Sequence, residues 1–502
     1  MNLPVLTVLI AIPAVTAVVI TLFIPAGNRT ALRSTALFGT ALTLAATVGL
    51  VLRFEPIAGF QLRETATWIP QWGVSYRLGV DGVSLFLVAL TALVMPLVIA
   101  ASWEQAVRVK GFFASLLALE ASLIGVFLAL DLVLFYLFFE IMLVPMYALI
   151  GIWGGANRRY AALKFFLYTL VGGFLMLISI LYLYFQPGGG TFSYETLTDV
   201  ARGLDSTQQA LLFTGFFAAF AIKVPLFPFH TWLPDAHTEA PTAGSVVLAA
   251  VMLKIGGYGF LRYSLPMFPD ATSRLAPIIL TLGVIGVLYG ALVAMVQRDI
   301  KKLVAYSSVA HLGFVVIGVF ALHPTGASGA VVQMVNHGIS TGALFLLVGF
   351  LYDRTHSRQI AEYSGLLKAM PVFGGLFLVT VMSSVALPGL NGFVGEFPIL
   401  LGAYQTVPWA AVLAAFGVIL AALYLLWAYQ RMFHGPVEGR AVGLLDLNAR
   451  EITVMVPLVA LMLGIGLYPQ PIYDRVNPTV ERIVSEARAG ADLPAVAQGA
   501  GR

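Results

Sequence analysis

Long apolar runs alternate along the chain with short connections rich in polar residues, proline or glycine. Because a helix needs about 20 apolar residues to cross the hydrocarbon core of a bilayer, each run predicts one transmembrane span. The pattern therefore predicts an all-α polytopic membrane protein of about fourteen spans. These are expected at 3–24, 31–52, 82–102, 111–130, 132–153, 162–186, 210–229, 242–263, 275–297, 302–322, 328–352, 371–403, 408–433 and 450–468.

Two of these runs contain residues that interrupt a helix. The seventh has Pro225 and Pro228 soon after Lys223, and the twelfth, too long for one straight helix, has a break from Pro388 to Gly392. Spans 4–8 and 9–13 form two five-helix blocks, each broken in its fourth span. An odd number of spans per block predicts an inverted repeat, and matching broken helices in the two halves indicate a transport path.

This pattern divides the chain into four expected regions. Residues 1–110 hold three helices and an outer loop, 111–263 the first five-helix repeat, and 264–433 the second, inverted repeat. Residues 434–502 hold the last span and a polar tail from about 470, which is expected to be poorly ordered. The apolar run at the N-terminus lacks a basic flank and is too long for a signal peptide, so it is interpreted as a retained span.

Basic residues predict the orientation, because loops on the cytoplasmic side carry an excess of lysine and arginine. Connections after odd-numbered spans hold Arg29, Arg33, Arg108, Lys110, Arg158, Arg159, Arg298, Lys301, Lys302, Arg354, Arg358, Lys368, Arg431, Arg440 and Arg450. The opposite side holds Arg53, Arg63, Arg77, Arg202, Arg262 and Arg274, then four arginines in the tail. Both termini are therefore expected on the outer side, which is the periplasm if the source is a bacterium.

Composition narrows the chemistry. Of 502 residues, 59% are hydrophobic and only 10% are charged, against about 25% charged in soluble domains. The chain has no cysteine, which excludes disulfides, thiolate-bound iron–sulfur clusters and cysteine-ligated zinc within it. It also lacks a glycine-rich phosphate loop. Any redox chemistry or nucleotide hydrolysis that drives this protein must therefore come from a partner.

The main candidates among the charges inside predicted spans are Glu140, Lys223, Lys254 and Glu396. A charge at the centre of a spanning helix costs roughly 2.5–3.5 kcal/mol, so such residues usually pair, face water or move ions. Glu140 is interpreted as an ionised partner of Lys223, and Glu396, after the second break, as a terminal proton site. The alternatives are a protonated, hydrogen-bonded Glu140, a Lys254 that reaches toward an interface, and a Glu396 that caps the restarted helix.

Histidines supply the other candidate groups, because their usual pKa near 6.5 suits proton relay. His311 and His337 lie in spans 10 and 11, where they are either relays or hydrogen-bonded core residues, and a haem pair is not favoured. His230 and His237 lie in a loop at the basic face, where they either feed protons or cap helices. Glu120, which is also in mid-span, is a weaker candidate, and Asp131 and Lys164 are expected at the interface.

Several motifs are highly specific. The run KVPLFPFHTWLPDAH from Lys223, followed by APTAGS from Ala240, resembles the antiporter-like proton-translocating subunits of respiratory complex I. The runs FEIMLVPMY around Glu140, LKIGGYG around Lys254 and RDIKKLVAYSS from Arg298 resemble the same family. It includes Mrp-type cation/proton antiporter subunits and membrane-bound hydrogenase subunits, and the similarity covers about residues 80–435.

Within that family the chain resembles the M-type branch, because it has an acid at Glu396 and no long lateral helix after the last span. The resemblance implies a proton-translocating subunit of NADH:quinone oxidoreductase in a bacterial inner membrane, which moves protons from cytoplasm to periplasm. It implies a Glu140–Lys223 pair, a mid-membrane axis through Lys254 and histidines, and Glu396 as the terminal site.

The resemblance also implies partners. The neighbours are expected to be L-type and N-type subunits and the lipid bilayer, with no nucleic acid. FMN, iron–sulfur clusters and quinone are expected in partner subunits, with no cofactor or metal in this chain. The alternatives are an Mrp-type sodium/proton antiporter subunit and a purely structural membrane scaffold.

Overall fold

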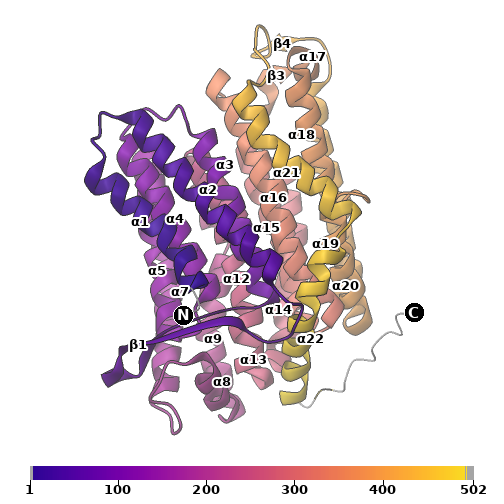
Figure 1. Cartoon of the computed structure of the whole chain (residues 1–502). Coiled ribbons are helices and arrows are strands. Elements are labelled where there is room, and N and C mark those ends of the chain that lie inside the picture. The colour runs from indigo at the N-terminus through magenta and orange to yellow at the C-terminus, as the bar shows by residue number, and fades with distance from the viewer. Residues whose placement is uncertain (1–3, 492, 494–502) are drawn as a thin grey trace.

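The computed structural model describes residues 4–491 and 493, and nearly all of them lie in a bundle of long helices (Figure 1). Within the described residues, twelve helices are long and apolar enough to cross a membrane. They are α1 (Val5–Phe23), α2 (Arg29–Arg53), α3 (Gly82–Ala101), α4 (Val109–Leu128), α5–α6 (Leu132–Trp153), α7 (Arg158–Tyr184), α11–α13 (Thr242–Met267), α14 (Pro269–Met295), α15 (Ile300–Phe320), α16 (Pro324–Thr355), α20 (Pro408–Phe433) and α21 (Ala449–Leu467).

The expected all-α polytopic class is confirmed, while the count of fourteen spans, the inverted repeat and the four-region division stay predictions. The other predicted spans correspond to helix pairs: α9 (Ser206–Lys223) with α10 (Trp232–Glu239), and α18 (Pro371–Ser384) with α19 (Asn391–Thr406). The remaining elements are α8 (Tyr194–Arg202), α17 (Leu366–Ala369), α22 (Gln470–Gly490), β1 (Gln61–Ile69), β2 (Val74–Val80), β3 (Tyr363–Ser364) and β4 (Glu438–Gly439). Short 3-10 turns lie at Pro70–Trp72 and Ile360–Glu362.

The chain leaves the helical path at both predicted breaks. After Lys223 the prolines at 225 and 228 cannot donate backbone hydrogen bonds, and α10 begins only at Trp232. The second break depends on two glycines. Gly389 has a left-handed φ of +92°, and a Cβ on Gly392 would come within 2.0 Å of the Ser383 carbonyl oxygen. Only glycine permits so tight a return to the helix.

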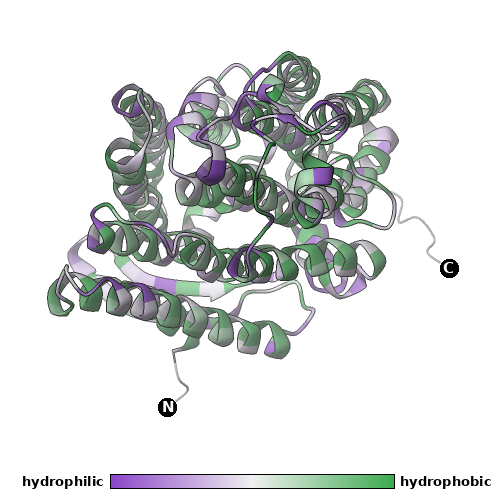
Figure 2. Ribbon diagram, turned by 90° about the horizontal axis from the view of Figure 1, so that it is seen from above, coloured by the Kyte–Doolittle hydropathy of each residue, from purple (hydrophilic) through white to green (hydrophobic). Residues whose placement is uncertain are grey.

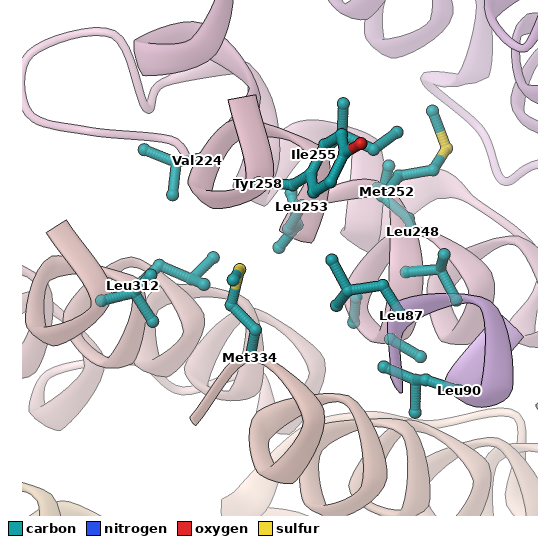
Figure 3. Packing of buried hydrophobic residues seen from close by; sticks show 14 of the residues in the cluster. Leu87, Leu90, Val224, Leu248, Met252, Leu253, Ile255, Tyr258, Leu312 and Met334 are labelled. Atoms are coloured by element: carbon teal, nitrogen blue, oxygen red, sulfur yellow. The ribbon is translucent and has the colours of Figure 1, made fainter. Parts of the chain in front are cut away.

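Three helices form the centre of the bundle. All of the most apolar window of α16 is buried, as is that of α11–α13, and 94% of that of α15 is buried. Leu248, Leu253, Leu312 and Met334 pack between these helices (Figure 3). Viewed from above, hydrophobic residues cover the helices and hydrophilic residues gather in the connections (Figure 2). A polar group within these buried windows therefore lies away from bulk water.

The two ends of the bundle differ. The antiparallel hairpin β1–β2 lies at the lower end in Figure 1 with α8 and α22, whereas the short pair β3–β4 lies at the upper end with α17. The carboxylate of Glu64 on β1 accepts hydrogen bonds from the backbone N–H groups of Leu6 (2.7 Å) and Thr7 (3.0 Å), which ties the start of α1 to the hairpin. The sequence pattern did not predict this hairpin.

The expectation of a poorly ordered tail is wrong for residues 470–490, which form α22, while residues 494–502 lie outside the described residues. Buried side chains recur at helical spacing along one face of α22: Val476, Thr479, Val480, Ile483, Val484 and Ala487. This face packs against α3, α13, α14 and α16. The many polar residues of α22 occupy its other face, which is why overall composition misled the prediction.

Candidate functional site

Lys254 lies at the centre of the bundle and is completely buried. It opens α12 (Lys254–Gly259), directly after a π-helical stretch, η2 (Leu248–Met252). Such π turns widen a helix and are frequent at functional sites. The Lys254 ammonium donates to the carbonyl of Ala249 and lies 2.6 Å from Nδ1 of His337. It is held within the bundle, so the alternative that Lys254 reaches toward an interface is wrong.

The two histidines of α15 and α16 continue from that contact. The ring centroids of His337 and His311 are 5.8 Å apart, and both residues are buried. Nδ1 of His311 lies 2.7 Å from Oε1 of Glu396, which also accepts a hydrogen bond from Nε2 of Gln333 (2.8 Å). On each histidine, Nε2 has no protein partner among the described residues. Four titratable groups from α12, α16, α15 and α19 thus form one buried chain.

The break before α19 holds Glu396 in this position. Asn391, the first residue of α19, accepts a hydrogen bond from Ser383 through Oδ1 (2.5 Å). Its carbonyl accepts another from Nδ2 of Asn336 on α16 (2.6 Å). Glu396 itself bonds side chains of neighbouring helices, and no side chain caps α19. The alternative role of Glu396 as a helix cap is therefore wrong.

Lys223 and Glu140 lie within electrostatic reach of one another without forming a hydrogen bond. Lys223 ends α9 and is buried, and its ammonium lies 4.8 Å from the centre of the Phe139 ring and 5.8 Å from that of Phe165. The alternative was that Glu140 is hydrogen-bonded. Its Oε1 atom does not support this alternative, because it has no hydrogen-bond partner among the described residues. A Cβ at Gly173 of α7 would come within 1.8 Å of this oxygen.

A break in the helix follows Glu140 directly. α5 (Leu132–Ile141) ends one residue later, and α6 (Leu143–Trp153) begins after Met142. Pro145 lacks the N–H that would bond to the carbonyl of Ile141, which explains the interruption. Glu140 is only partly buried, so its carboxylate lies near the lateral surface of this chain.

His230 and His237 face different helices. His230 follows α9 in the broken segment, and its ring lies 5.2 Å from that of Tyr289 on α14. His237 belongs to α10 and not to a loop, a correction to the prediction, and it stacks on Phe345 of α16 at 4.6 Å and 9°. It is completely buried, and neither ring nitrogen has a protein partner among the described residues. Of these two histidines, only His237 lies within electrostatic reach of Lys254 and His337.

Of the three other candidates, Asp131 and Lys164 make structural contacts, whereas Glu120 makes no hydrogen bond among the described residues. Asp131 caps α5 through the N–H groups of Val133 and Leu134 and also accepts from Ser75 of β2 (2.9 Å). Burial raises the pKa of Asp131 to about 6, against the lowering effect of these three donors. Lys164 forms an ion pair with Asp235 at 2.7 Å. Glu120 is fully buried, and its carboxylate has no hydrogen-bond partner among the described residues.

Three polar residues of the interior escaped the sequence analysis. Arg262, which was expected in an outer loop, is buried in a π-helical stretch, η3 (Phe260–Ser264), and pairs with Asp81 at 2.5 Å. Lys301, also counted among loop cations, is buried in the first turn of α15. Gln333 joins Glu396 without any sequence signal. Arg262 and Lys301 could have been identified as buried residues, because each lies beside an apolar run.

Comparisons with known proteins show the family to which a chain with this geometry belongs. The model of the family described as NADH:quinone oxidoreductase/Mrp antiporter, TM, matches residues 129–423, more than half of the chain. The chain belongs to this family. The predicted resemblance is therefore confirmed.

Relatives of the NADH:quinone oxidoreductase/Mrp antiporter family match over nearly the whole length. NADH-quinone oxidoreductase subunit M of Rhodobacter capsulatus is 47% identical over 485 residues, covering 94% of each chain. The subunit of the same name from Mycobacterium tuberculosis (strain ATCC 25618 / H37Rv) is 42% identical over 535 residues, covering 99% of this chain and 97% of the relative. The expected kinship with the M-type branch, and with an oxidoreductase complex, is confirmed.

Two solved structures share the fold of this chain. A chain of respiratory complex I from Thermus thermophilus with bound NADH has a TM-score of 0.89 at 33% identity, covering 96% of this chain and 99% of that one. A chain of the Mrp complex from Dietzia sp. DQ12-45-1b has a TM-score of 0.85, covering 98% and 100%. At 22% identity, that second likeness extends to the fold alone. No group of three or more His, Cys, Asp or Glu in the described residues could hold a metal ion.

Proposed function

We propose that this chain is the proton-translocating M subunit of a bacterial NADH:quinone oxidoreductase. The observation that carries the proposal is the buried chain Lys254–His337–His311–Glu396, in which neighbouring groups touch or nearly touch. Proton transfer requires donor and acceptor within about 2.6–3.2 Å, or one intervening water. The first and last contacts meet that distance, and the unpartnered Nε2 atoms of the two histidines are available for the step between them.

In the proposed cycle, protons enter from the cytoplasmic side and load Lys223 and Lys254. Charge then passes from Lys254 through His337 and His311 to Glu396, which releases a proton toward the periplasm. Glu140 acts by attraction on the Lys223 ammonium. The Lys223 ammonium is buried and has no hydrogen-bond partner among the described residues, so the attraction of Glu140 and the nearby rings are what opposes its loss of solvation.

The source of energy is proposed to lie outside this chain. The curated relatives are subunits of an oxidoreductase, so other subunits of such a complex are its partners. We propose L-type and N-type antiporter-like subunits as its neighbours, and FMN, iron–sulfur clusters and quinone in other subunits. The bundle lies in the bacterial inner membrane, and both ends of the chain face the periplasm, as the distribution of basic residues favours.

The test is His337→Gln in the assembled complex, because glutamine can still accept a bond from Lys254 but cannot relay a proton. In inverted membrane vesicles, proton uptake is followed by quenching of a pH-sensitive dye while NADH oxidation is measured separately. We expect proton uptake per NADH to fall at least tenfold, within the range of about 10²–10⁴ for lost proton-transfer groups. His434→Gln, at an exposed histidine, is the control and should leave pumping unchanged.

Two outcomes would decide against the proposal. Normal pumping by an intact His337→Gln complex would remove the histidine chain from the mechanism. Sodium-dependent proton exchange without NADH, in membranes that lack the oxidoreductase partners, would identify the chain as an Mrp-type antiporter subunit.

A further inference from the structure

Lys301 is a buried lysine that the proposed cycle does not use. It lies in the first turn of α15, within the run RDIKKLVAYSS, and only 8% of its surface is exposed. Asp299, the N-cap of α15, bonds the backbone N–H groups of Lys301 (2.8 Å) and Lys302 (3.2 Å). This cap fixes the direction of α15 and points the Lys301 side chain at α10. There its ammonium donates to the carbonyl oxygen of Ala240 at 2.6 Å.

Lys301 and His237 meet at the C-terminal end of α10, because the Lys301 ammonium bonds the carbonyl of Ala240, three residues after His237. The charges of both Lys301 and Lys254 act on the His237 ring, and His237 in turn acts on His337. The ring is completely buried, and neither of its nitrogens has a protein partner among the described residues. Buried polar groups in native proteins are nearly always bonded or engaged in function. His237 is therefore placed to exchange protons between Lys301 and the pair Lys254–His337.

On the outer side, two residues close to Lys301 in the sequence, Asp299 and Lys302, line a polar cavity at the basic face of the bundle. The cavity has a volume of about 420 Å³, and its lining includes Arg298, Asp299 and Gln359. Asp299 connects the cavity to the interior, because its Oδ2 pairs with Nε of Arg358 (3.1 Å) and its charge acts on Lys301. The other charges that act on the Lys301 ammonium are those of Glu239, Asp353 and Arg358.

We infer that Lys301 is the entry residue of this proton path, which takes protons from the cavity at the basic face and passes them to His237. In the forward step the Lys301 ammonium gives one proton to a ring nitrogen of His237 and becomes a neutral amine. His237 then gives a proton to the pair Lys254–His337, and Lys301 is protonated again from the cavity. The inference rests on the proposed function and adds its input side.

The bond to Ala240 raises a structural alternative, because a lysine can stabilise the last carbonyls of a helix. The two roles differ in one property. A capping residue must be a cation, whereas an entry residue must also release its proton. Arginine keeps the charge and the donor but stays protonated in proteins. Lys301→Arg therefore preserves the structural role and removes the relay.

The experiment compares Lys301→Arg and Lys301→Met with the control Lys368→Arg, at an exposed lysine of α17. Each complex is checked for assembly on native gels, and then for proton uptake per NADH oxidised in inverted vesicles. We expect both Lys301 variants to lose at least tenfold in this ratio while the control retains it. If Lys301→Arg pumps normally and Lys301→Met does not, the residue is a helix cap and the inference is overturned.

If Lys301→Arg does not assemble, His237→Gln decides, because the route requires a titratable ring at 237. Normal pumping by that variant would overturn the inference. Failure of the inference is distinguishable from failure of the proposed function. If His337→Gln abolishes pumping while Lys301→Arg and His237→Gln leave it intact, only the entry route is wrong. If all three variants pump normally, the proposed function is wrong as well.

Discussion

Glu140→Gln tests whether a charge that makes no direct bond controls Lys223. The change keeps the shape of the side chain, so the close contact with Gly173 of α7 is preserved. Oε1 of Glu140 has no hydrogen-bond partner among the described residues, and neither does the Lys223 ammonium. The substitution therefore breaks no bond at either of these atoms and removes one negative charge. Any effect on function reports electrostatics and not packing.

The size of that effect follows from the separation of the two groups. Two unit charges 4 Å apart attract by about 4 kcal/mol at an effective dielectric constant of about 20. Glu140 and Lys223 form no ion pair within that distance, so about 4 kcal/mol is an upper bound. Since about 1.4 kcal/mol is a factor of ten, the carboxylate favours the ammonium form of Lys223 by up to several hundredfold. Losing this bias should leave Lys223 unable to load and release protons in step with the cycle.

The assay is proton uptake per NADH oxidised in inverted vesicles that carry the assembled complex. We expect Glu140→Gln to reduce this ratio at least tenfold while the amount of assembled complex stays unchanged. Glu438→Gln, at an exposed glutamate of β4, is the matched control. Wild-type pumping by an intact Glu140→Gln complex would refute the electrostatic role of Glu140 and, with it, the first half of the proposed cycle.

Two further predictions concern the end of the bundle that carries β1. Asp81→Asn keeps an oxygen to cap α3 but leaves the buried Arg262 guanidinium uncompensated, so the free energy of unfolding should fall by about 3–5 kcal/mol. A lower thermal midpoint of the complex checks this, and an unchanged midpoint contradicts it. Burial raises the pKa of Asp131 to about 6, above its unfolded value of about 3.9, so the folded protein binds this proton more tightly. The free energy of unfolding should therefore decline as pH rises from about 4 to 6 and level off above. Thermal midpoints across this range check it, and a slope that Asp131→Asn leaves unchanged would contradict it.

Much of the fold could be predicted from local sequence. Apolar runs long enough to cross a bilayer marked each of the twelve long apolar helices in the described residues, because a membrane span is decided by a local property. The breaks after Lys223 and around Gly389 were also local, since proline and glycine act on their own backbone. The prediction failed for the C-terminal segment, where the number of polar residues was considered but the spacing of the apolar ones was not. The polar residues of α22 suggested disorder, although its apolar residues recur on one face.

For the candidate site too, part could be predicted from local sequence and part could not. Lys254, His311, His337 and Glu396 stood out as polar groups within apolar helices, and the family resemblance implied an axis through Lys254 and histidines to Glu396. The sequence did not give the contacts that join these residues, which are the Lys254–His337 and His311–Glu396 contacts. Arg262 was assigned to a loop because its partner, Asp81, lies 181 positions away in the sequence. A pairing across such a separation depends on how α3 and the α11–α13 helix pack, which no local pattern contains.

By itself, the sequence determined that this protein is a helical membrane bundle with charges buried in broken spans, because hydrophobicity and backbone chemistry are properties of short segments. Only the tertiary structure decided which charges meet. It placed Lys254 against His337 and His311 against Glu396, left Glu140 and Lys223 without a hydrogen bond, and drew Lys301 inward from an apparent loop. The physical reason is that a buried polar group is satisfied by whichever helix packs beside it, and packing brings together residues far apart in the chain.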